Sequence, residues 1–377
     1  MTYYAGLDVS MKETSVAIVN EEGKIVFETL CKTHPLIIAE TLKSSTFVLN
    51  KIGIESGSIS FWLIEELKTL NVDAICIESR QMATLIALKV NKTDRNDARL
   101  IANAMRCNLY KEVHHKTKES IKVGLQMGAR RTLIDIRTKL KNSVRGFLKA
   151  YGIRLGATSH ADFSEIVRET LNNHPIDVQK AIEGLLRSYE EVCKNIDESE
   201  KALTKLSKED PVIQLLETIP GIGSITALTY KAVIDNPYRF KKARDVGAYL
   251  GLTPTQYSSG DSIKQGGISK CGSSELRNLL VECAIVILTR SNKWTKLKAW
   301  GLKIMKRSGI KKAASAMARK LAIIMLRMWQ EGKPFIYGEK KEKTDKEVAA
   351  VIPQEKEERL RKRERRSATI EKAAVYA

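Results

Sequence analysis

The first eighty residues contain short apolar runs in an order that few folds can accommodate. Three runs, within residues 3–9, 15–19 and 25–27, are separated by polar connections such as EEGK. Two further runs, within 46–55 and 72–79, flank the amphipathic stretch 59–70. Short runs bounded by turn residues predict strands, whereas apolar spacings of three and four predict a helix. Three meandering strands followed by alternating helix and strand predict a ribonuclease-H-like α/β domain.

Long helical patterns follow this domain. Residues 119–151 combine an apolar stripe with many Lys and Arg side chains, which predicts a basic amphipathic helix. After a looser stretch at 156–175, apolar residues recur from Val178 to Leu206 at spacings of three and four. This heptad pattern predicts either an antiparallel helical hairpin or an intermolecular coiled coil.

The remainder of the chain divides into a helical part and a charged end. Pro211 to about Gln330 is predicted to be mainly helical, with a flexible Gly/Ser-rich loop at 253–274. Beyond Gly338 the sequence is charged and nearly free of aromatic residues, which is typical of a disordered tail or a lone helix. We therefore expect four parts: an α/β domain at 1–118, a basic helix and coiled-coil region at 119–210, a mainly helical domain at 211–337, and the tail at 338–377.

The formal net charge of +20 predicts a polyanionic partner. The tail contributes twelve basic and nine acidic residues, so +17 remains on the body. Between Arg290 and Lys320 there are eleven Lys or Arg and no acid, with Trp294 and Trp300 among them. Protein surfaces usually mix both signs, whereas a surface of one sign neutralises phosphates and releases counterions. The candidate nucleic-acid contacts are Arg130, Arg131, Arg137, Lys141, Arg145, Lys293, Lys296, Lys306, Arg307, Lys311 and Lys312.

The composition argues against several other classes of protein. Six cysteines without a CxxC pair, and five histidines with none beyond His174, disfavour a zinc ribbon and a disulfide scaffold. The cysteine pattern instead fits a reduced cytoplasm. Neither a signal-peptide pattern nor an apolar run of the roughly 20 residues that span a bilayer is present. We expect a cytoplasmic protein.

Four acidic residues are candidate ligands for a divalent metal. Asp8 lies within the first predicted strand, where a carboxylate needs a partner or a cation. Glu55 ends the fourth strand, and in a ribonuclease-H-like sheet these two strands are neighbours. Asp94 and Asp97 are three residues apart and share one face of a predicted helix. Four carboxylates suit two Mg²⁺ ions about 4 Å apart, which clamp the attacking and leaving oxygens of a phosphodiester.

Ordinary structural roles also fit some of these acids. Thr93 or Asp94 could cap the helix, with Asp97 completing a capping box. Acids in a first helical turn also complement the helix dipole. Glu55 could be a surface strand end, and Glu78, which ends the fifth strand, is a rival ligand.

Two motifs stand out in the C-terminal part. Gly221 and Gly223, in IPGIG, predict a helix-hairpin-helix turn whose backbone amides can approach a phosphate, although an ordinary helix–helix turn fits as well. Ser258 and Ser259 precede Gly260 in the Gly/Ser-rich loop. No histidine follows them in the chain, which argues against a Ser-His-Asp hydrolase. A nucleophilic serine here would need a metal, a basic side chain or a DNA phosphate nearby.

Taken in order, these motifs resemble one family of transposases. The segments GLDVS, GIESG and NKTDRNDAR, followed by IPGIG, GLTPTQYSSG and ISKCGSSELRNLL, are similar to those of the DEDD-motif transposases of the IS110 family of bacterial insertion sequences. The resemblance implies a RuvC-like N-terminal domain with four metal ligands, Asp8, Glu55, Asp94 and Asp97. It also implies a C-terminal transposase domain whose essential serine falls on Ser259, with Ser258 as the second choice.

The same resemblance implies a function. It is Mg²⁺-dependent excision and insertion of the element through a transient serine–phosphate link to DNA. An element-encoded bridge RNA, dimers that assemble into tetramers, and action at the bacterial nucleoid are implied in the same way. The nearest alternative is a RuvC-like junction nuclease in which water attacks. A non-catalytic DNA- or RNA-binding relative and an actin-like sugar kinase are further alternatives, although the chain lacks the second Gly-rich loop that a kinase needs.

Overall fold

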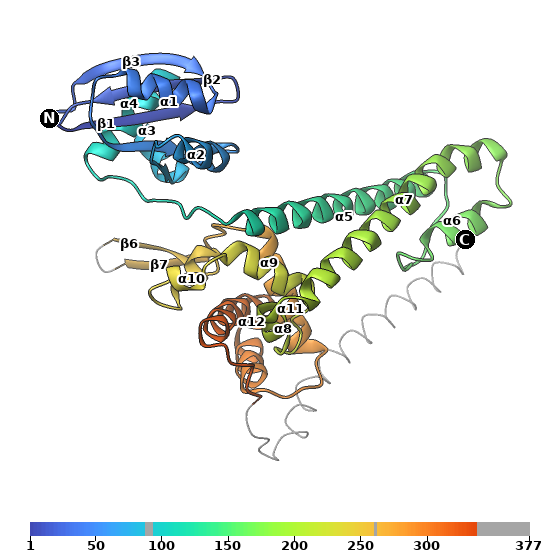
Figure 1. Cartoon of the computed structure of the whole chain (residues 1–377). Helices are drawn as coiled ribbons and strands as arrows, with labels where there is room; N and C mark the ends of the chain where they lie inside the picture. The colour runs from blue at the N-terminus through green and yellow to red at the C-terminus, as the bar shows by residue number, and fades with distance from the viewer. Residues whose placement is uncertain (87–92, 260–261, 338–377) are drawn as a thin grey trace. The chain divides into compact units, whose positions relative to one another are not determined.

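The computed structural model describes residues 1–86, 93–259 and 262–337. The chain forms two compact units, Met1–Lys116 and a second unit that begins at Thr117 (Figure 1). The predicted tail at 338–377 lies outside the described residues. In the part of the chain that the structure describes, no helix is both long and apolar enough to cross a membrane.

A five-stranded mixed sheet forms the centre of the N-terminal unit. Its strands are β1 (Tyr3–Val9), β2 (Glu13–Val19), β3 (Ile25–Lys32), β4 (Leu49–Glu55) and β5 (Ala74–Ile77), in the spatial order β3-β2-β1-β4-β5. The pairs β1–β2 and β2–β3 are antiparallel, and the pairs β1–β4 and β4–β5 are parallel. The predicted ribonuclease-H-like α/β fold is thereby confirmed.

Helices cover both faces of this sheet. They are α1 (Pro35–Ser44), α2 (Ser60–Thr69), α3 (Ser79–Ile86) and α4 (Asp94–Arg106). Ala5 and Leu7 of β1 are fully buried in a core shared with α1 and α2. On the other face, Ile101 and Met105 of α4 pack with Ile77 of β5. Since successive side chains of a strand point to opposite faces, Gly6 and Asp8 belong to the face that α4 covers.

Two glycines allow α4 to lie directly on the strands. A Cβ atom at Gly6 of β1 would lie 2.2 Å from the carbonyl oxygen of Ala98. One at Gly53 of β4 would lie 2.7 Å from Cγ of Met105. Such distances leave no room for a side chain, so both strands meet the helix with bare backbone. This contact sets the height of α4 above the sheet.

The second unit begins with a helical hairpin formed by α5 (Lys118–Ala150) and α7 (Ile176–Lys208). Val144 and Leu148 near the end of α5 share a core with Ile182 and Leu186 near the start of α7. Farther along the hairpin, Arg130 of α5 contacts Glu200 of α7, so the two helices are antiparallel. An antiparallel hairpin was one of the two arrangements that the heptad pattern from Val178 to Leu206 allowed. Ile182, Tyr189, Ile196 and Leu203 of that pattern are buried, and so are Leu186 and Ser207.

One helix within this hairpin was missed from the sequence. The stretch described as loose contains α6 (Phe163–Leu171). Phe163, Val167 and Leu171 are four residues apart and are buried against α5 and α7. That spacing is the helical signal in the sequence, but the helix is short and has few apolar residues outside its buried stripe.

A helical body around one core forms the rest of the described chain. Its helices are α8 (Pro211–Glu217), α9 (Ser224–Ile234), the short 3-10 helix η1 (Pro237–Arg239), α10 (Asp245–Tyr249), α11 (Ser274–Thr289) and α12 (Lys296–Glu331). The helix α12 is broken at Gly309, whose φ of 79° is not helical. Lys320 lies 4.5 Å from the Trp300 ring centre, and a Cβ at Gly301 would lie 2.6 Å from Sδ of Met317. The two halves of α12 therefore fold back on each other, with Gly309 at the tip.

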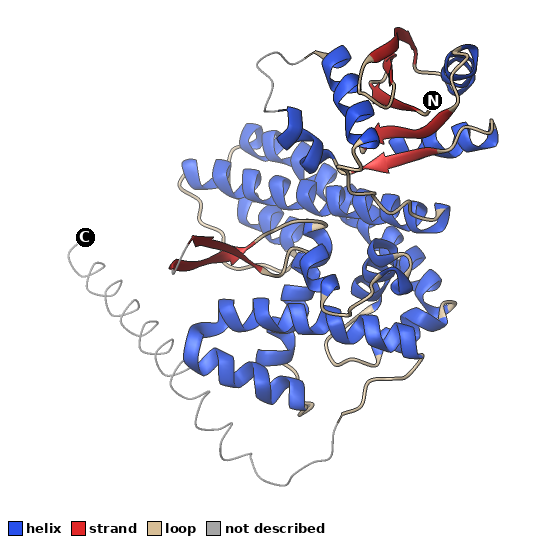
Figure 2. Cartoon of the chain, turned by 90° about the vertical axis from the view of Figure 1, so that its left-hand side faces the viewer, coloured by secondary structure: helices blue, strands red, loops and turns tan. Residues whose placement is uncertain are grey.

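The predicted Gly/Ser-rich loop is in fact a two-stranded ribbon. The strands β6 (Pro254–Ser259) and β7 (Ser262–Ile268) pair antiparallel. Figure 2 shows them as the red strands among the helices of the second unit. The prediction of a flexible loop was wrong because Gly and Ser are poor strand formers, and cross-strand pairing rather than residue propensity holds the ribbon.

The contact between Gly6 and α4 leads to a stability prediction. Gly6→Ala places a methyl group against the backbone of α4, so the helix must move away from the sheet. We expect the free energy of unfolding to fall by about 1–3 kcal/mol, measured by urea denaturation. Gly57→Ala is the control in the same unit, because its nearest neighbour, Oγ of Ser60, lies 3.4 Å away. Equal effects of the two changes would contradict the importance of this contact.

Candidate functional site

Two of the four predicted metal ligands lie side by side at one end of the sheet. Leu7 of β1 pairs with Ile54 of β4, so Asp8 and Glu55 occupy the next position of two parallel neighbours. Gly6 and Gly53, two residues earlier, both meet α4. Because side chains alternate along a strand, Asp8 and Glu55 also point to the α4 face. Both residues are half-buried.

The direction of α4 brings the other two acids to the same end. At the end of α4, Arg106 Nη1 donates to the carbonyl of Glu21, 3.1 Å away, in the turn between β2 and β3. That turn lies beside the beginning of β1, because Tyr4 pairs with Val19. The helix therefore runs antiparallel to β1. Its first turn, with Asp94 and Asp97, lies toward the end of β1 that carries Asp8.

An ion pair holds α4 in this direction. Arg99 donates from Nε and Nη2 to the two carboxylate oxygens of Glu28 in β3, at 2.6 and 2.7 Å. The hydrogen bonds from Arg99 lower the pKa of the Glu28 carboxyl. Two parallel hydrogen bonds between a guanidinium and a carboxylate fix the relative orientation of the two groups as well as their distance.

Helix capping does not explain Asp97. Thr93 is the N-cap, and its hydroxyl accepts a hydrogen bond from the Asn96 amide at 3.3 Å. The capping-box position is therefore Asn96, and the alternative that assigned it to Asp97 is wrong. Asp94 is the first helical residue and is exposed, whereas Asp97 is only 6% exposed. A carboxylate buried on a sheet-facing side is costly unless donors or a cation accompany it.

The donor set suits a hard divalent cation, although no closed ligand shell is formed. Oxygen ligands from two strand ends and one helix are what Mg²⁺ binds in proteins. Within residues 1–86, 93–259 and 262–337, no three His, Cys, Asp or Glu side chains are grouped closely enough to hold a metal ion. The rival Glu78 lies 3.6 Å from Lys111 Nζ, and Ile77 rather than Glu78 is paired with Glu55. Because Glu78 is not the residue beside Glu55 in the sheet and contacts Lys111 instead, we prefer Glu55 to Glu78 as the candidate ligand.

The predicted serines lie on opposite faces of the ribbon. Ser258 Oγ accepts a hydrogen bond from Gln256 Nε2 at 2.9 Å. Ser259 ends β6, is exposed, and shares its face with Tyr257 and with Lys264, which pairs with Tyr257. Tyr257 is 72% exposed. An exposed ring and a cation beside Ser259 are suited to a nucleotide, and both were missed because their common face depends on strand pairing.

The IPGIG segment forms the tight turn between α8 and α9. Gly221 has a φ of 84°, and a Cβ there would lie 2.9 Å from Cγ1 of Ile287 in α11. Only glycine therefore fits this position. Gly223 is the N-cap of α9, is exposed, and has open space where a side chain would be. The geometry is that of the predicted turn, and its contact with a phosphate remains a prediction.

Most of the predicted nucleic-acid contacts on α5 have partners within the chain. Arg130 pairs with Glu200, and Arg131 pairs with Asp135. Lys141 Nζ donates to the carbonyls of Thr158 and Ser159, and Arg145 donates to those of Leu155 and Gly156. Arg137 is half-buried. Arg130, Lys141 and Arg145 therefore hold the hairpin and its connecting loop, so less of their charge is available to a phosphate.

The predicted nucleic-acid contacts on α12 are more exposed than those on α5. Lys296, Lys306, Arg307, Lys311 and Lys312 are exposed, and the last four surround the tip at Gly309. Among the residues that the structure describes, none of these five has a side-chain hydrogen bond or ion pair. Lys293 lies 3.5 Å from the hydroxyl of Tyr337. The tip of α12 therefore presents a concentrated positive charge.

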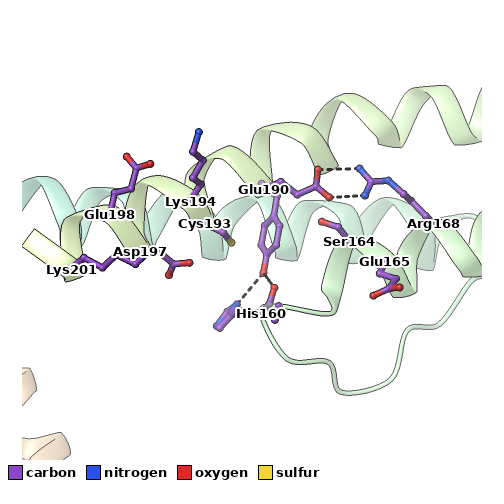
Figure 3. A pocket seen from close by; sticks show the side chains of 12 residues that line it. His160, Ser164, Glu165, Arg168, Glu190, Cys193, Lys194, Asp197, Glu198 and Lys201 are labelled. Carbon is purple, nitrogen blue, oxygen red and sulfur yellow. Dashed lines mark hydrogen bonds and ion pairs between the residues drawn. The ribbon is translucent and has the colours of Figure 1, made fainter.

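A charged pocket between α6 and α7 contains none of the predicted site residues (Figure 3). Arg168 of α6 joins Glu183 and Glu190 of α7, with the closest contacts at 2.9 and 2.6 Å. The Tyr189 hydroxyl donates to the carbonyl of His160 at 3.0 Å. Burial lowers the pKa of His160 and raises that of Tyr189 to about 12. Because Arg168 pairs with two glutamates of α7, we interpret this cluster as a contact that holds α6 against α7.

The tip of α12 leads to a prediction about salt dependence. Replacing Lys306, Arg307, Lys311 or Lys312 by Gln is expected to weaken binding to duplex DNA of any sequence. Each lost phosphate contact should make the negative slope of log K against log salt concentration shallower by about 0.9. Fluorescence anisotropy with a labelled random duplex measures the binding constant K at each salt concentration. Lys141→Gln is the control and should leave the slope unchanged, because Lys141 already donates to two carbonyls. Unchanged slopes in all four α12 variants would exclude the tip as a phosphate contact.

Comparison with known proteins is consistent with these features. Residues 5–153 match a transposase model of the DEDD type, and residues 213–299 match the model described as transposase IS116/IS110/IS902 family. The transposase for insertion sequence element IS1111A of Coxiella burnetii is 28% identical over 329 residues, which cover 85% of this chain and 87% of that protein. The transposase for insertion sequence element IS1328 of Yersinia enterocolitica is 31% identical over 251 residues, which cover 66% of this chain and 75% of that protein.

Among solved structures, RuvC of T. thermophilus in complex with a Holliday junction substrate is similar to 30% of this chain and is covered over its whole length. The sequence identity is 12% and the TM-score is 0.24. The ribonuclease-H-like assignment rests on the strand order and not on this likeness. The two family models and the relatives confirm the resemblance seen in the motifs. The chain belongs to the IS110 family of transposases and is an enzyme that acts on DNA.

Proposed function

We propose that this transposase excises and inserts its element by Mg²⁺-dependent phosphoryl transfer, with Ser259 as the nucleophile. The observation that carries the proposal is the position of Asp8, Glu55, Asp94 and Asp97 at one end of the N-terminal sheet. A DEDD-type, RuvC-like nuclease fold generally uses divalent metals, and these carboxylates are the ligands that fit Mg²⁺. When bound there, Mg²⁺ would stabilise the charge that develops on a phosphodiester.

The second unit would supply the nucleophile. In the proposed reaction the Ser259 hydroxyl loses its proton to solvent and its oxygen forms a bond to phosphorus. The bond from phosphorus to a strand oxygen breaks, and that oxygen takes a proton from solvent and leaves as the strand hydroxyl. Attack of another strand hydroxyl on the serine phosphodiester then restores Ser259 and joins the new strands. Lys264 is placed to contact the phosphate, and Tyr257 to stack on a neighbouring base.

The partners of the proposed reaction are donor and target DNA, an element-encoded bridge RNA, and further copies of this chain. The exposed cations of α12 support a polyanionic partner, and they do not distinguish DNA from RNA. Exposed apolar side chains on α5 support assembly: Leu125 is 71% exposed and Phe147 is 59% exposed. An apolar stripe on the outside of a hairpin is suited to a second copy, as in a homodimer that assembles into a tetramer.

The serine mechanism is tested by Ser259→Ala. The substrate is a plasmid that carries the element with its flanking DNA and its non-coding RNA, supplied with Mg²⁺. We expect loss of strand cleavage and of the covalent protein–DNA adduct on denaturing gels, because Ser259, unlike Ser258, lies on the face with Tyr257 and Lys264. Ser258→Ala is the matched control and should retain both. Full cleavage by Ser259→Ala would instead support a RuvC-like nuclease in which water attacks.

The metal site is tested by Asp97→Asn. Removing one charge from the ligand set should weaken Mg²⁺ binding by roughly 10- to 100-fold, measured by isothermal titration calorimetry on the full chain. Strand cleavage should fall with it. Glu78→Gln is the control and should leave Mg²⁺ affinity unchanged, since Glu78 contacts Lys111 instead. Unchanged affinity in Asp97→Asn would remove Asp97 from the site.

A further inference from the structure

The serine ribbon β6–β7 has little contact with the helical body along its length. Its residues from Gln256 to Ser259 are all exposed, and so are Lys264 to Gly267 on the other strand. An isolated two-stranded hairpin is only marginally stable in water. The direction of the ribbon, and with it the position of Ser259, must therefore be set where the two strands leave the body. We call this place the root, and it consists of residues 249–253 and 268–273.

The two segments of the root interlock through their backbones. A Cβ at Gly251, whose φ is 65°, would lie 2.2 Å from the amide nitrogen of Cys271. A Cβ at Gly272, whose φ is 69°, would lie 2.2 Å from the carbonyl oxygen of Tyr249. Both glycines are required by their φ and by this close approach. Neither segment can shift without moving the other.

Hydrogen bonds continue this contact to the base of the strands. The Ser269 amide donates to the carbonyl of Thr253 at 2.8 Å, and the Lys270 amide donates to that of Gly251 at 3.1 Å. Lys270 has a φ of 56°, which an L-residue with a long side chain adopts only when its surroundings impose it. The root is thus held in one conformation although the ribbon above it is exposed.

A single buried cation joins the two segments. Arg277 of α11 is only 8% exposed. Its Nη1 donates to the carbonyls of Leu250 at 3.1 Å, Cys271 at 2.8 Å and Ser273 at 3.5 Å. Leu250 precedes β6, whereas Cys271 and Ser273 follow β7. A buried charge is tolerated only when it is hydrogen-bonded, so Arg277 and these carbonyls depend on each other.

We infer that Arg277 is a positioning residue for the transposition reaction. It fixes both ends of the serine ribbon to α11, whose neighbouring Leu276 and Leu280 are fully buried in the core. The guanidinium does not reach the reacting atoms. It acts through the root, by holding Ser259 at a constant distance and direction from the helical body. This inference rests on the proposed role of Ser259 as the nucleophile.

The test compares Arg277→Met with wild type in the plasmid cleavage assay. A displacement of about 1 Å at a reacting atom can reduce a rate roughly 100-fold, so we expect a loss of that size in the single-turnover cleavage rate. Affinity for DNA should be unchanged, because Arg277 is buried. Arg277→Lys, which keeps a cation with three donors but loses the planar fork, should be intermediate. Guanidinium added to Arg277→Ala should restore cleavage in part, and equimolar NaCl should not.

Leu280→Ala is the control for a general loss of stability. It removes a buried side chain from the same helix, one turn away, and leaves the hydrogen bonds from Arg277 Nη1 to the root in place. Below its unfolding temperature it should cleave at the wild-type rate. Hydrogen exchange of the wild-type protein tests the root without any substitution. The amides of Ser269 and Lys270 should exchange as slowly as the core amides of α11.

The outcomes separate this inference from the proposed function. Wild-type cleavage by Arg277→Met, with Ser259→Ala inactive, would overturn the positioning role and leave the serine mechanism intact. Exchange of the Ser269 and Lys270 amides as fast as that of the exposed ribbon would also overturn it, even if no Arg277 variant folded. Full cleavage by Ser259→Ala would overturn the proposed function itself.

Discussion

The contact of α4 with the bare backbone of β1 and β4 is the constraint on which the N-terminal site depends. Without a side chain at Gly6 or Gly53, the helix lies so close that its first turn can share a site with two strand ends. The ion pair between Arg99 and Glu28 fixes the helix along its length. A candidate metal site made from two strands and one helix therefore has its geometry set by backbone packing and by the Arg99–Glu28 ion pair, rather than by contacts among its own four carboxylates.

The basic residues on α5 and on α12 of the second unit have different surroundings. On α5 the cations hold the hairpin, because Glu200 and the carbonyls of the connecting loop lie within reach of them. On α12, Lys306, Arg307, Lys311 and Lys312 surround the tip at Gly309, and within the described part of the chain none of them has a side-chain hydrogen bond or ion pair. Lys and Arg side chains on the two helices thus have different roles, because the residues around them differ. Burial and pairing, rather than formal charge, identify the surface for a nucleic acid.

The serine ribbon and its root show a similar division between exposure and rigidity. In the proposed serine mechanism, Ser259 has to be exposed to reach a DNA phosphate, but an exposed two-stranded ribbon has little stability of its own. The interlocked glycines and the buried guanidinium of Arg277 supply that stability at the root. The exposure of Ser259 and the rigidity of the root therefore depend on different residues, which lie 8 to 18 positions apart in the chain.

Much of this organisation could be predicted from the sequence, because local patterns report local structure. Apolar periodicity and turn residues predicted the strands of the N-terminal domain and gave a helical hairpin as one of two possibilities for the region after it, and the ordered motifs identified the family. The four acids and Ser259 were found because carboxylates in a strand and serines before a glycine are unusual in sequence as well as in space. Their roles as ligands and nucleophile remain proposals.

Contacts between distant segments decided the rest. Whether Asp97 caps a helix or faces a sheet depends on where α4 lies, and whether Lys141 is open to a phosphate depends on a loop that folds back on it. The ribbon in place of a loop, the face shared by Tyr257 and Ser259, and the root held by Arg277 all result from pairing across many residues. The sequence by itself determined which chemical groups are present and which elements carry them. Only the tertiary structure determined which groups meet, because burial and partner choice are set by packing between segments that no local pattern connects.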